Sequence, residues 1–152
     1  MKTFHELQEG VYDPNIFKAI FMAGGPGSGK SYVAKRTTSG LGLKMVNSDD
    51  IYEKMLNDAG LDTTPEDIYS DKGQEIRGRA KGVTSRMKGN FLDGRLGLII
   101  DGTGKDYAKI AKQVQGLKLL GYECYMIFVN TSLDTAQEQN AKRKRTLPEK
   151  EV

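Results

Sequence analysis

Short runs of apolar residues alternate along the chain with longer segments whose apolar positions recur at helical spacing. This alternation is typical of a parallel sheet whose strands are connected by helices. The sequence therefore predicts an α/β fold, with a parallel β-sheet sandwiched by helices. The predicted strands are residues 19–23, 43–46, 96–100 and 122–129. Polar residues or glycines follow each run, at the end of the strand where open α/β sheets bind their ligands.

The longest predicted helical segment begins at Thr64 and Pro65, a capping hydroxyl followed by a proline in the first turn. Its apolar stripe comprises Ile76, Ala80, Val83, Met87 and Phe91. A second stripe on another face comprises Arg77, Lys81, Thr84 and Lys88. Another helix is predicted from Tyr107 to the residues before Gly121, and a last one begins near Ser132 or Asp134.

The composition indicates one folded domain spanning residues 1–152. Hydrophobic residues make up 38% and charged residues 28% of the chain, and the formal net charge is +3. Cys124 is the only cysteine, which excludes an internal disulfide and favours a reducing compartment. No apolar run approaches the roughly 18 residues of a membrane span, so we expect a cytoplasmic protein without a membrane partner. Residues 147–152 resemble the first turn of a helix, which predicts a domain that is incomplete at its C-terminus.

A glycine-rich segment between the first predicted strand and the next helix matches the pattern G-x-x-x-x-G-K-[ST]. It consists of Gly24, Gly25, Pro26, Gly27, Ser28, Gly29, Lys30 and Ser31, and the predicted nucleotide site includes the following Tyr32. Glycines allow backbone N–H groups to surround phosphates, and the helix N-terminus adds a favourable dipole. We expect Lys30 to reach the β- and γ-phosphates of ATP and Ser31 to bind Mg²⁺. The alternative is a glycine-rich turn that binds nothing.

Carboxylates follow the second and third predicted strands. A kinase needs one to orient the acceptor hydroxyl and take its proton. Asp50 and Glu53 resemble a capping box, which would leave Asp49 as the general base. Asp101 is a candidate for holding Mg²⁺, with the hydroxyl of Thr103 beside it. The residues alone do not decide whether Asp49, Asp50 or Asp101 is the base, and helix or turn capping is the alternative for each.

A basic segment, residues 142–145, follows the last predicted helix. Four consecutive positions spread around a helix, so they cannot all face one ligand. Arg143 and Arg145 are the candidates for a short basic lid, because guanidinium groups neutralise charge on a transferring phosphoryl group. The alternative is a solvated helix end whose cations suit the helix dipole.

The ordered motifs GGPGSGKS, VNSDD, LIIDGTG and NAKRKRTLP resemble the P-loop kinases of the polynucleotide 5′-hydroxyl kinase and zeta-toxin group. The resemblance is closest to zeta-toxin-like or polynucleotide-kinase-like proteins of bacteriophages. It implies an adenylate-kinase-like P-loop fold, with Asp49 as the general base and Asp101 and Thr103 holding substrate. It also implies that Arg143 or Arg145 lies near the transferred phosphate.

Tyr52 departs from the pattern, because polynucleotide kinases commonly have an arginine there that holds the acceptor's 3′-phosphate. Arg77 and Arg86 are candidates to replace it. The sequence thus predicts an ATP- and Mg²⁺-dependent kinase acting on a nucleotide-like or polynucleotide hydroxyl. The alternatives are an ATPase or nucleotide switch acting on a protein partner, and an inactive relative. Glycine, not glutamate, follows Asp101, which argues against a mechanical ATPase.

Overall fold

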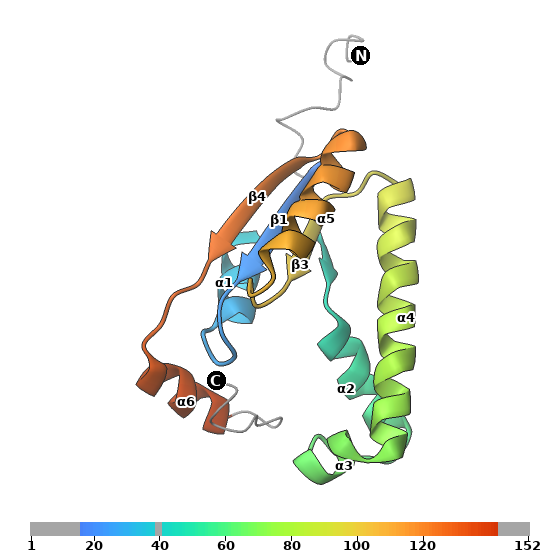
Figure 1. Ribbon diagram of the computed structural model, residues 1–152, viewed down its shortest axis with the longest axis vertical. Helices are drawn as coiled ribbons and strands as arrows, with labels where there is room; N and C mark the ends of the chain where they lie inside the picture. The colour runs from blue at the N-terminus through green and yellow to red at the C-terminus, as the bar shows by residue number, and fades with distance from the viewer. Residues whose placement is uncertain (1–15, 39–40, 143–152) are drawn as a thin grey trace.

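The sheet has four parallel strands in the order β2-β3-β1-β4 (Figure 1). The computed structural model describes residues 16–38 and 41–142. The strands are β1 (Lys18–Ala23), β2 (Lys44–Val46), β3 (Leu98–Asp101) and β4 (Glu123–Phe128). Each lies within two residues of its predicted position, because each contains a short apolar run. β1 and β3 are largely buried, whereas Tyr125, Met126 and Phe128 of β4 are exposed. The predicted fold class is confirmed.

The strand register aligns the carboxyl ends of the three strands that matter for the site. Met22 of β1 pairs with Asp101 of β3, and Val46 of β2 pairs with Ile100 of β3. The residues that follow β1 and β2 therefore emerge at the level of Asp101, at one edge of the sheet.

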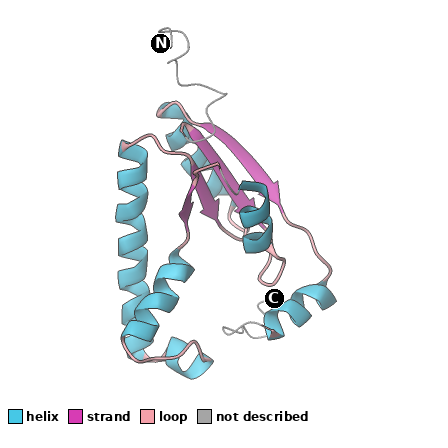
Figure 2. Cartoon of the chain, turned by 180° about the vertical axis from the view of Figure 1, so that it is seen from behind, coloured by secondary structure: helices cyan, strands magenta, loops and turns pink. Residues whose placement is uncertain are grey.

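Helices cover both faces of the sheet. On one face, α5 (Tyr107–Leu119) and the end of α4 (Asp71–Asp93) pack over the alternate strand residues Ala19, Phe21 and Leu98. On the other face, α1 (Lys30–Thr38) packs over Met22 and Ile99. Figure 2, which views the molecule from behind, shows α1 in front of the strands. The alternation of strand residues between two covered faces explains why the runs of β1 and β3 are continuously apolar.

Three helices are inserted between β2 and β3: α2 (Ser48–Asp58), α3 (Pro65–Tyr69) and α4. They enclose a hydrophobic cluster of their own, formed by Tyr52, Leu56, Ile68, Ile76 and Ala80. The helical segment predicted from Thr64 is interrupted at Ser70, whose side chain accepts a hydrogen bond from the N–H of Gly73 and caps α4. Met87, predicted to face the core, is 37% exposed.

The last described helix, α6 (Leu133–Ala141), follows β4 and begins at the N-cap Ser132, as predicted. Gly121, at φ +88, lies just beyond the end of α5, also as predicted. Within residues 16–38 and 41–142, no helix has the length and apolar character needed to cross a bilayer.

Candidate functional site

The glycine-rich segment forms a loop between the end of β1 and the start of α1. Gly24, Gly27 and Gly29 have φ values of +150°, +76° and +87°, which L side chains rarely adopt. The Lys30 ammonium donates hydrogen bonds to the carbonyl oxygens of Gly24, at 2.7 Å, and Gly25, at 2.9 Å. The loop therefore curves around the Lys30 side chain, at the N-terminus of α1, where a helix attracts anions.

The same loop packs tightly against α6 and against Val129, which follows β4. A Cβ atom on Gly27 would lie 2.2 Å from the carbonyl oxygen of Ala136, and one on Gly24 would lie 2.6 Å from that of Val129. Ala136 is 5% exposed, so the contact is closed to solvent. Only glycine fits at these two positions, and α6 therefore supports the loop from outside.

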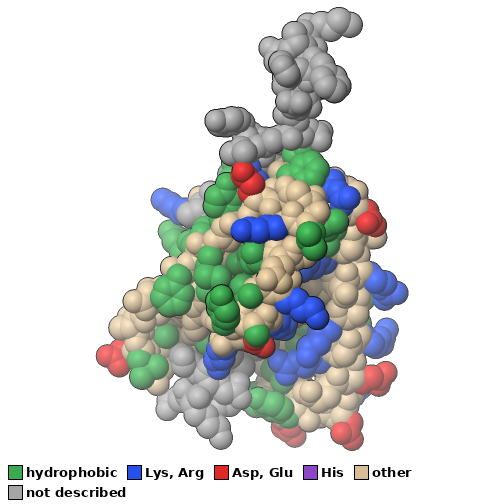
Figure 3. All heavy atoms as spheres, turned by 45° about the horizontal axis from the view of Figure 1, so that its top comes forward, with side chains coloured by type: hydrophobic (Ala, Val, Ile, Leu, Met, Phe, Trp, Pro, Cys, Tyr) green, Lys and Arg blue, Asp and Glu red, His purple; other side chains and the backbone are tan. Residues whose placement is uncertain are grey.

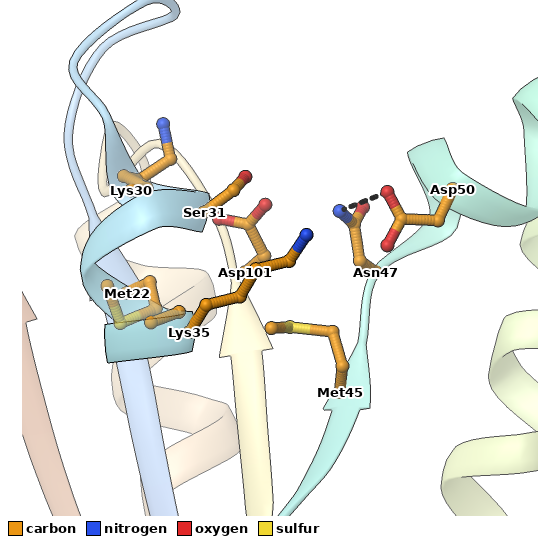
Figure 4. Close-up of a pocket in the computed structure, with 9 residues that line it drawn as sticks. Met22, Lys30, Ser31, Lys35, Met45, Asn47, Asp50 and Asp101 are labelled. Carbon is orange, nitrogen blue, oxygen red and sulfur yellow. Dashed lines mark hydrogen bonds between the residues drawn. The ribbon is translucent and has the colours of Figure 1, made fainter. Parts of the chain in front are cut away.

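Beside this loop is a pocket of about 80 Å³. At roughly 10–15 Å³ for each water, it can hold a metal ion and a few waters. Figure 4 shows Ser31 and Lys35 on one side, Asn47 and Asp50 on the other, and Asp101 between them. The lining residues are Met22, Lys30, Ser31, Ala34, Lys35, Met45, Asn47, Asp50 and Asp101. The structure thus brings the phosphate loop together with the carboxylates that follow β2 and β3.

The Asp101 carboxylate has an unusual environment for a charged group. Its Oδ1 atom is buried and has no hydrogen-bond partner among the described residues. Burial raises the pKa of this carboxyl; Lys30 opposes the shift, while the nearby charges of Asp49 and Asp50 add to it. A buried, unpaired carboxylate oxygen is costly unless a cation or a hydrogen-bond donor compensates it. The position of Asp101 therefore fits a metal ligand.

The start of α2 differs from the prediction. Its N-cap is Asn47, whose Oδ1 accepts a hydrogen bond from the N–H of Asp49 at 2.8 Å. The predicted capping box of Asp50 and Glu53 is wrong, because Asp50 lies inside the first turn. The Asn47 side chain donates to Asp50 Oδ1 at 3.3 Å (Figure 4). Asp50 lines the pocket and Asp49 does not, but both side chains are exposed and both act on Asp101 through their charges.

Sequence reasoning missed two polar residues of the pocket, Asn47 and Lys35. Asn47 directly follows a predicted strand and precedes Ser48 and the two aspartates. This position could have identified it as a residue of the site. Lys35 lies one helical turn after Ser31, and this i,i+4 spacing places both on one face of α1. Met22 and Met45 form the apolar part of the pocket lining. Nothing in the sequence beyond their positions in strands marks them as pocket residues.

The other predicted site residues lie outside the pocket lining. Tyr32 is 67% exposed. Thr103 supports the phosphate loop through its backbone, because its carbonyl oxygen accepts a hydrogen bond from the N–H of Gly24 at 3.2 Å. Arg143 and Arg145 lie outside the described residues.

A parallel sheet with a phosphate loop after its first strand and carboxylates after the neighbouring strands defines a P-loop nucleoside-triphosphate-binding fold. Residues 20–152 match the sequence profile of the AAA domain family AAA_33, a P-loop kinase family. The chain belongs to this family. A comparison with curated protein sequences gave no match.

Solved structures with the same fold include three complexes or systems. The Pnkp1/Rnl/Hen1 RNA repair complex contains a chain with a TM-score of 0.64 and 19% identity, over 89% of this chain and 41% of that one. A chain of the PezAT toxin–antitoxin system of Streptococcus pneumoniae has a TM-score of 0.60 and 17% identity, over 88% of this chain and 53% of that one. A chain of the AvrRxo1-ORF1:-ORF2 structure with ATP has a TM-score of 0.61 and 16% identity, over 83% of this chain and 40% of that one. The chain thus spans about half or less of these relatives, and the predicted resemblance to polynucleotide kinases and zeta toxins is confirmed at the level of the fold.

Proposed function

We propose that the protein is an ATP- and Mg²⁺-dependent kinase that transfers the γ-phosphoryl group to a hydroxyl of a nucleotide-like or polynucleotide acceptor. The observation that carries this proposal is the pocket where the phosphate loop meets Asp101, whose Oδ1 atom is buried. Family membership supports phosphoryl transfer, and one structural relative was solved with ATP. The choice of acceptor rests on the likeness to the RNA repair complex.

The phosphate loop and Lys30 bind the triphosphate in this proposal. The Lys30 ammonium already lies within the curve of the loop, held by the carbonyl oxygens of Gly24 and Gly25. Phosphate oxygens are stronger acceptors than these carbonyls, because they carry charge. Lys30 therefore holds the β- and γ-phosphates and stabilises the charge that develops on them during transfer.

Ser31 and Asp101 are the residues that would hold Mg²⁺. Both line the pocket, and the buried Oδ1 of Asp101 has no other partner among the described residues. Mg²⁺ is typically bound by one or two protein oxygens together with substrate phosphates and waters, and this donor set fits that pattern. When bound, the ion neutralises charge on the phosphate oxygens and orients them for in-line transfer.

Asp49 is the general base in this proposal. Asp50 already accepts a hydrogen bond from Asn47, which fixes it as part of the pocket wall. Asp49 is exposed on the first turn of α2, close enough to Asp101 to raise the pKa of its carboxyl. The acceptor oxygen bonds to the γ-phosphorus, the bond to the β–γ bridging oxygen breaks, and the hydroxyl proton passes to Asp49. In this proposal Arg143 and Arg145 belong to a short basic lid near the transferred phosphate.

A transfer assay with [γ-³²P]ATP and Mg²⁺ tests the proposal. The acceptors are oligonucleotides with 5′-hydroxyl ends, nucleosides, nucleoside monophosphates and nucleotide-sugars, each with a water-only control. The expected result is labelled acceptor from at least one class, formed faster than inorganic phosphate. Release of phosphate at the same rate with and without every acceptor would instead identify an ATPase.

A further inference from the structure

Lys35 is a charged residue of the pocket to which the proposed function gives no role. It lies on α1 one helical turn after Ser31. Figure 4 shows its side chain directed into the pocket, between Asp101 and Asn47. Side chains of an α-helix lean toward the N-terminus of the helix, so the Lys35 ammonium extends back toward the level of Ser31. Lys35 therefore adds a positive charge beside the residues that would hold the metal ion.

The two lysines of the pocket differ in how they are held. The Lys30 ammonium donates to the carbonyl oxygens of Gly24 and Gly25, within the curve of the loop. Within the described part of the chain, Lys35 makes no hydrogen bond or ion pair. Figure 3 shows other basic side chains gathered along α4, on the open surface of the molecule, whereas Lys35 faces a pocket that also contains carboxylates. The charge of Lys35 therefore acts on any ion that enters this pocket.

The charges of the pocket favour a metal–nucleotide complex over a metal ion alone. The lining contains two carboxylates and two ammonium groups, those of Asp50, Asp101, Lys30 and Lys35. A divalent ion that enters alone is attracted by the acids and repelled by both lysines. The same lysines attract Mg·ATP, because the triphosphate carries more negative charge than one Mg²⁺ neutralises. Each lysine thus has opposite effects on the two forms in which the metal can arrive.

Of the two lysines, Lys35 can be removed without altering the phosphate loop itself. Lys30 is part of the loop and is expected to contact the β- and γ-phosphates, so its loss affects the triphosphate directly. Lys35 lies one turn farther along α1 and is exposed, so solvent screens part of its charge. Its effect on metal affinity is consequently moderate, and it should weaken further as the salt concentration rises.

We propose that Lys35 is a specificity-determining residue that makes the pocket select Mg²⁺ in complex with ATP over the free ion. Its ammonium raises the Kd of the ion alone and lowers the Kd of the complex. This inference rests on the proposed kinase function and adds to it the form in which the metal enters. The protein then takes up metal and nucleotide together, and it binds little Mg²⁺ before ATP arrives.

Binding without turnover tests this proposal. Calorimetry measures the affinity of the full chain for MnCl₂ and MgCl₂ without nucleotide, and for an equimolar mixture of MgCl₂ and ATP. In Lys35→Met, which keeps the length of the side chain and removes its charge, we expect the affinity for Mn²⁺ and Mg²⁺ alone to rise about tenfold. The affinity for Mg·ATP should fall about 3- to 10-fold. Changes of opposite sign are the signature of charge, because a loss of packing would weaken both ligands.

Arg36→Met is the matched control, because Arg36 is exposed on α1 next to Lys35 but does not line the pocket. It removes the same charge from the same helix and should change each affinity by less than about twofold. Combining Lys35→Met with Asp101→Asn should abolish the gain in Mn²⁺ affinity, which assigns that gain to this pocket. Thermal unfolding shows whether each variant is folded, and Lys35→Gln replaces Lys35→Met if the latter is not.

Three results would overturn the proposal. The first is a Lys35→Met variant whose affinity for Mn²⁺ alone is unchanged or whose two affinities shift in the same direction. The second is a gain of equal size in Arg36→Met, because the effect would then be one of net charge. The third is a gain that persists when Asp101→Asn is added, because the ion would then bind elsewhere. None of these measurements involves an acceptor, so opposite shifts in a protein that transfers no phosphate would support the role of Lys35 and refute the kinase.

Discussion

Gly27 of the phosphate loop lies directly against the backbone of Ala136 in α6, where a Cβ atom would come within 2.2 Å of the Ala136 carbonyl oxygen. The loop and the helix after β4 are therefore one packed unit. The shape of the phosphate site depends on a helix that is far from it in the sequence.

Gly27→Ala should damage both stability and nucleotide binding. The added methyl group must displace α6 or the loop, and the φ of +76° adds strain of about 1–2 kcal/mol. We expect a lower melting temperature and at least a tenfold loss of ATP affinity, measured by thermal unfolding and calorimetry.

Gly60→Ala is the control, because Gly60 has a similar φ of +71° but no atom within 4 Å of an added Cβ. Gly60→Ala therefore introduces similar backbone strain but no steric clash. ATP affinity that fell equally in both variants would contradict the role assigned to the contact with Ala136.

Lys30→Ala should greatly slow phosphoryl transfer while the protein remains folded. The ammonium of Lys30 is the cation inside the curve of the loop, and removing one preorganised donor of this kind costs about 10²–10³ in kcat. The labelled-phosphate assay measures the loss. Lys112→Ala, on the exposed surface of α5, is the charge-matched control and should retain wild-type turnover.

Asp49→Asn and Asp50→Asn should have different effects on turnover. If Asp49 accepts the proton, its amide variant keeps ATP affinity and loses about 10²–10⁴ in kcat. Asp50→Asn changes a wall residue that bonds to Asn47, and we expect less than a tenfold change. Steady-state kinetics of both variants check this, and the reverse order would assign the base to Asp50.

Asp101→Asn should stabilise the metal-free protein at neutral pH. Burial raises the pKa of the Asp101 carboxyl, so the folded state holds its proton more tightly than the unfolded state does. That stabilisation is present at acid pH and is lost as the pH rises through the raised pKa. The asparagine variant cannot ionise, so its melting temperature should exceed that of wild type at pH 7, by an amount that shrinks as the pH falls towards about 4.

The same variant should lose the response to Mg²⁺ and ATP. Saturating ligand stabilises a folded protein, by about 2.7 kcal/mol at a hundred times Kd. Wild type should show such a gain only when Mg²⁺ accompanies ATP, and Asp101→Asn should show much less. An unchanged gain in the variant would remove Asp101 from the metal site.

Local sequence patterns predicted the strands, the phosphate loop and the carboxylates after β2 and β3, because these depend on apolar runs and on short-range turn chemistry. The cap of α2 was predicted wrongly, since Asn47 and Asp50 are both plausible capping residues and only the backbone decides between them. The contacts of Gly27 with Ala136 and of Arg77 with Tyr52 join separate elements, and no periodicity encodes them. Helical periodicity alone places Arg77 and Arg86 on opposite sides of α4, but it could not show which of the two faces α2.

The helices between β2 and β3 enclose a buried cluster that is separate from those on the two faces of the sheet, although the end of α4 also packs on one of these faces. Mutations that reshape this insertion therefore leave the packing beneath the phosphate loop intact. Substitutions in α3 and in the buried cluster around it can thus change the insertion while α1 keeps its packing on the sheet.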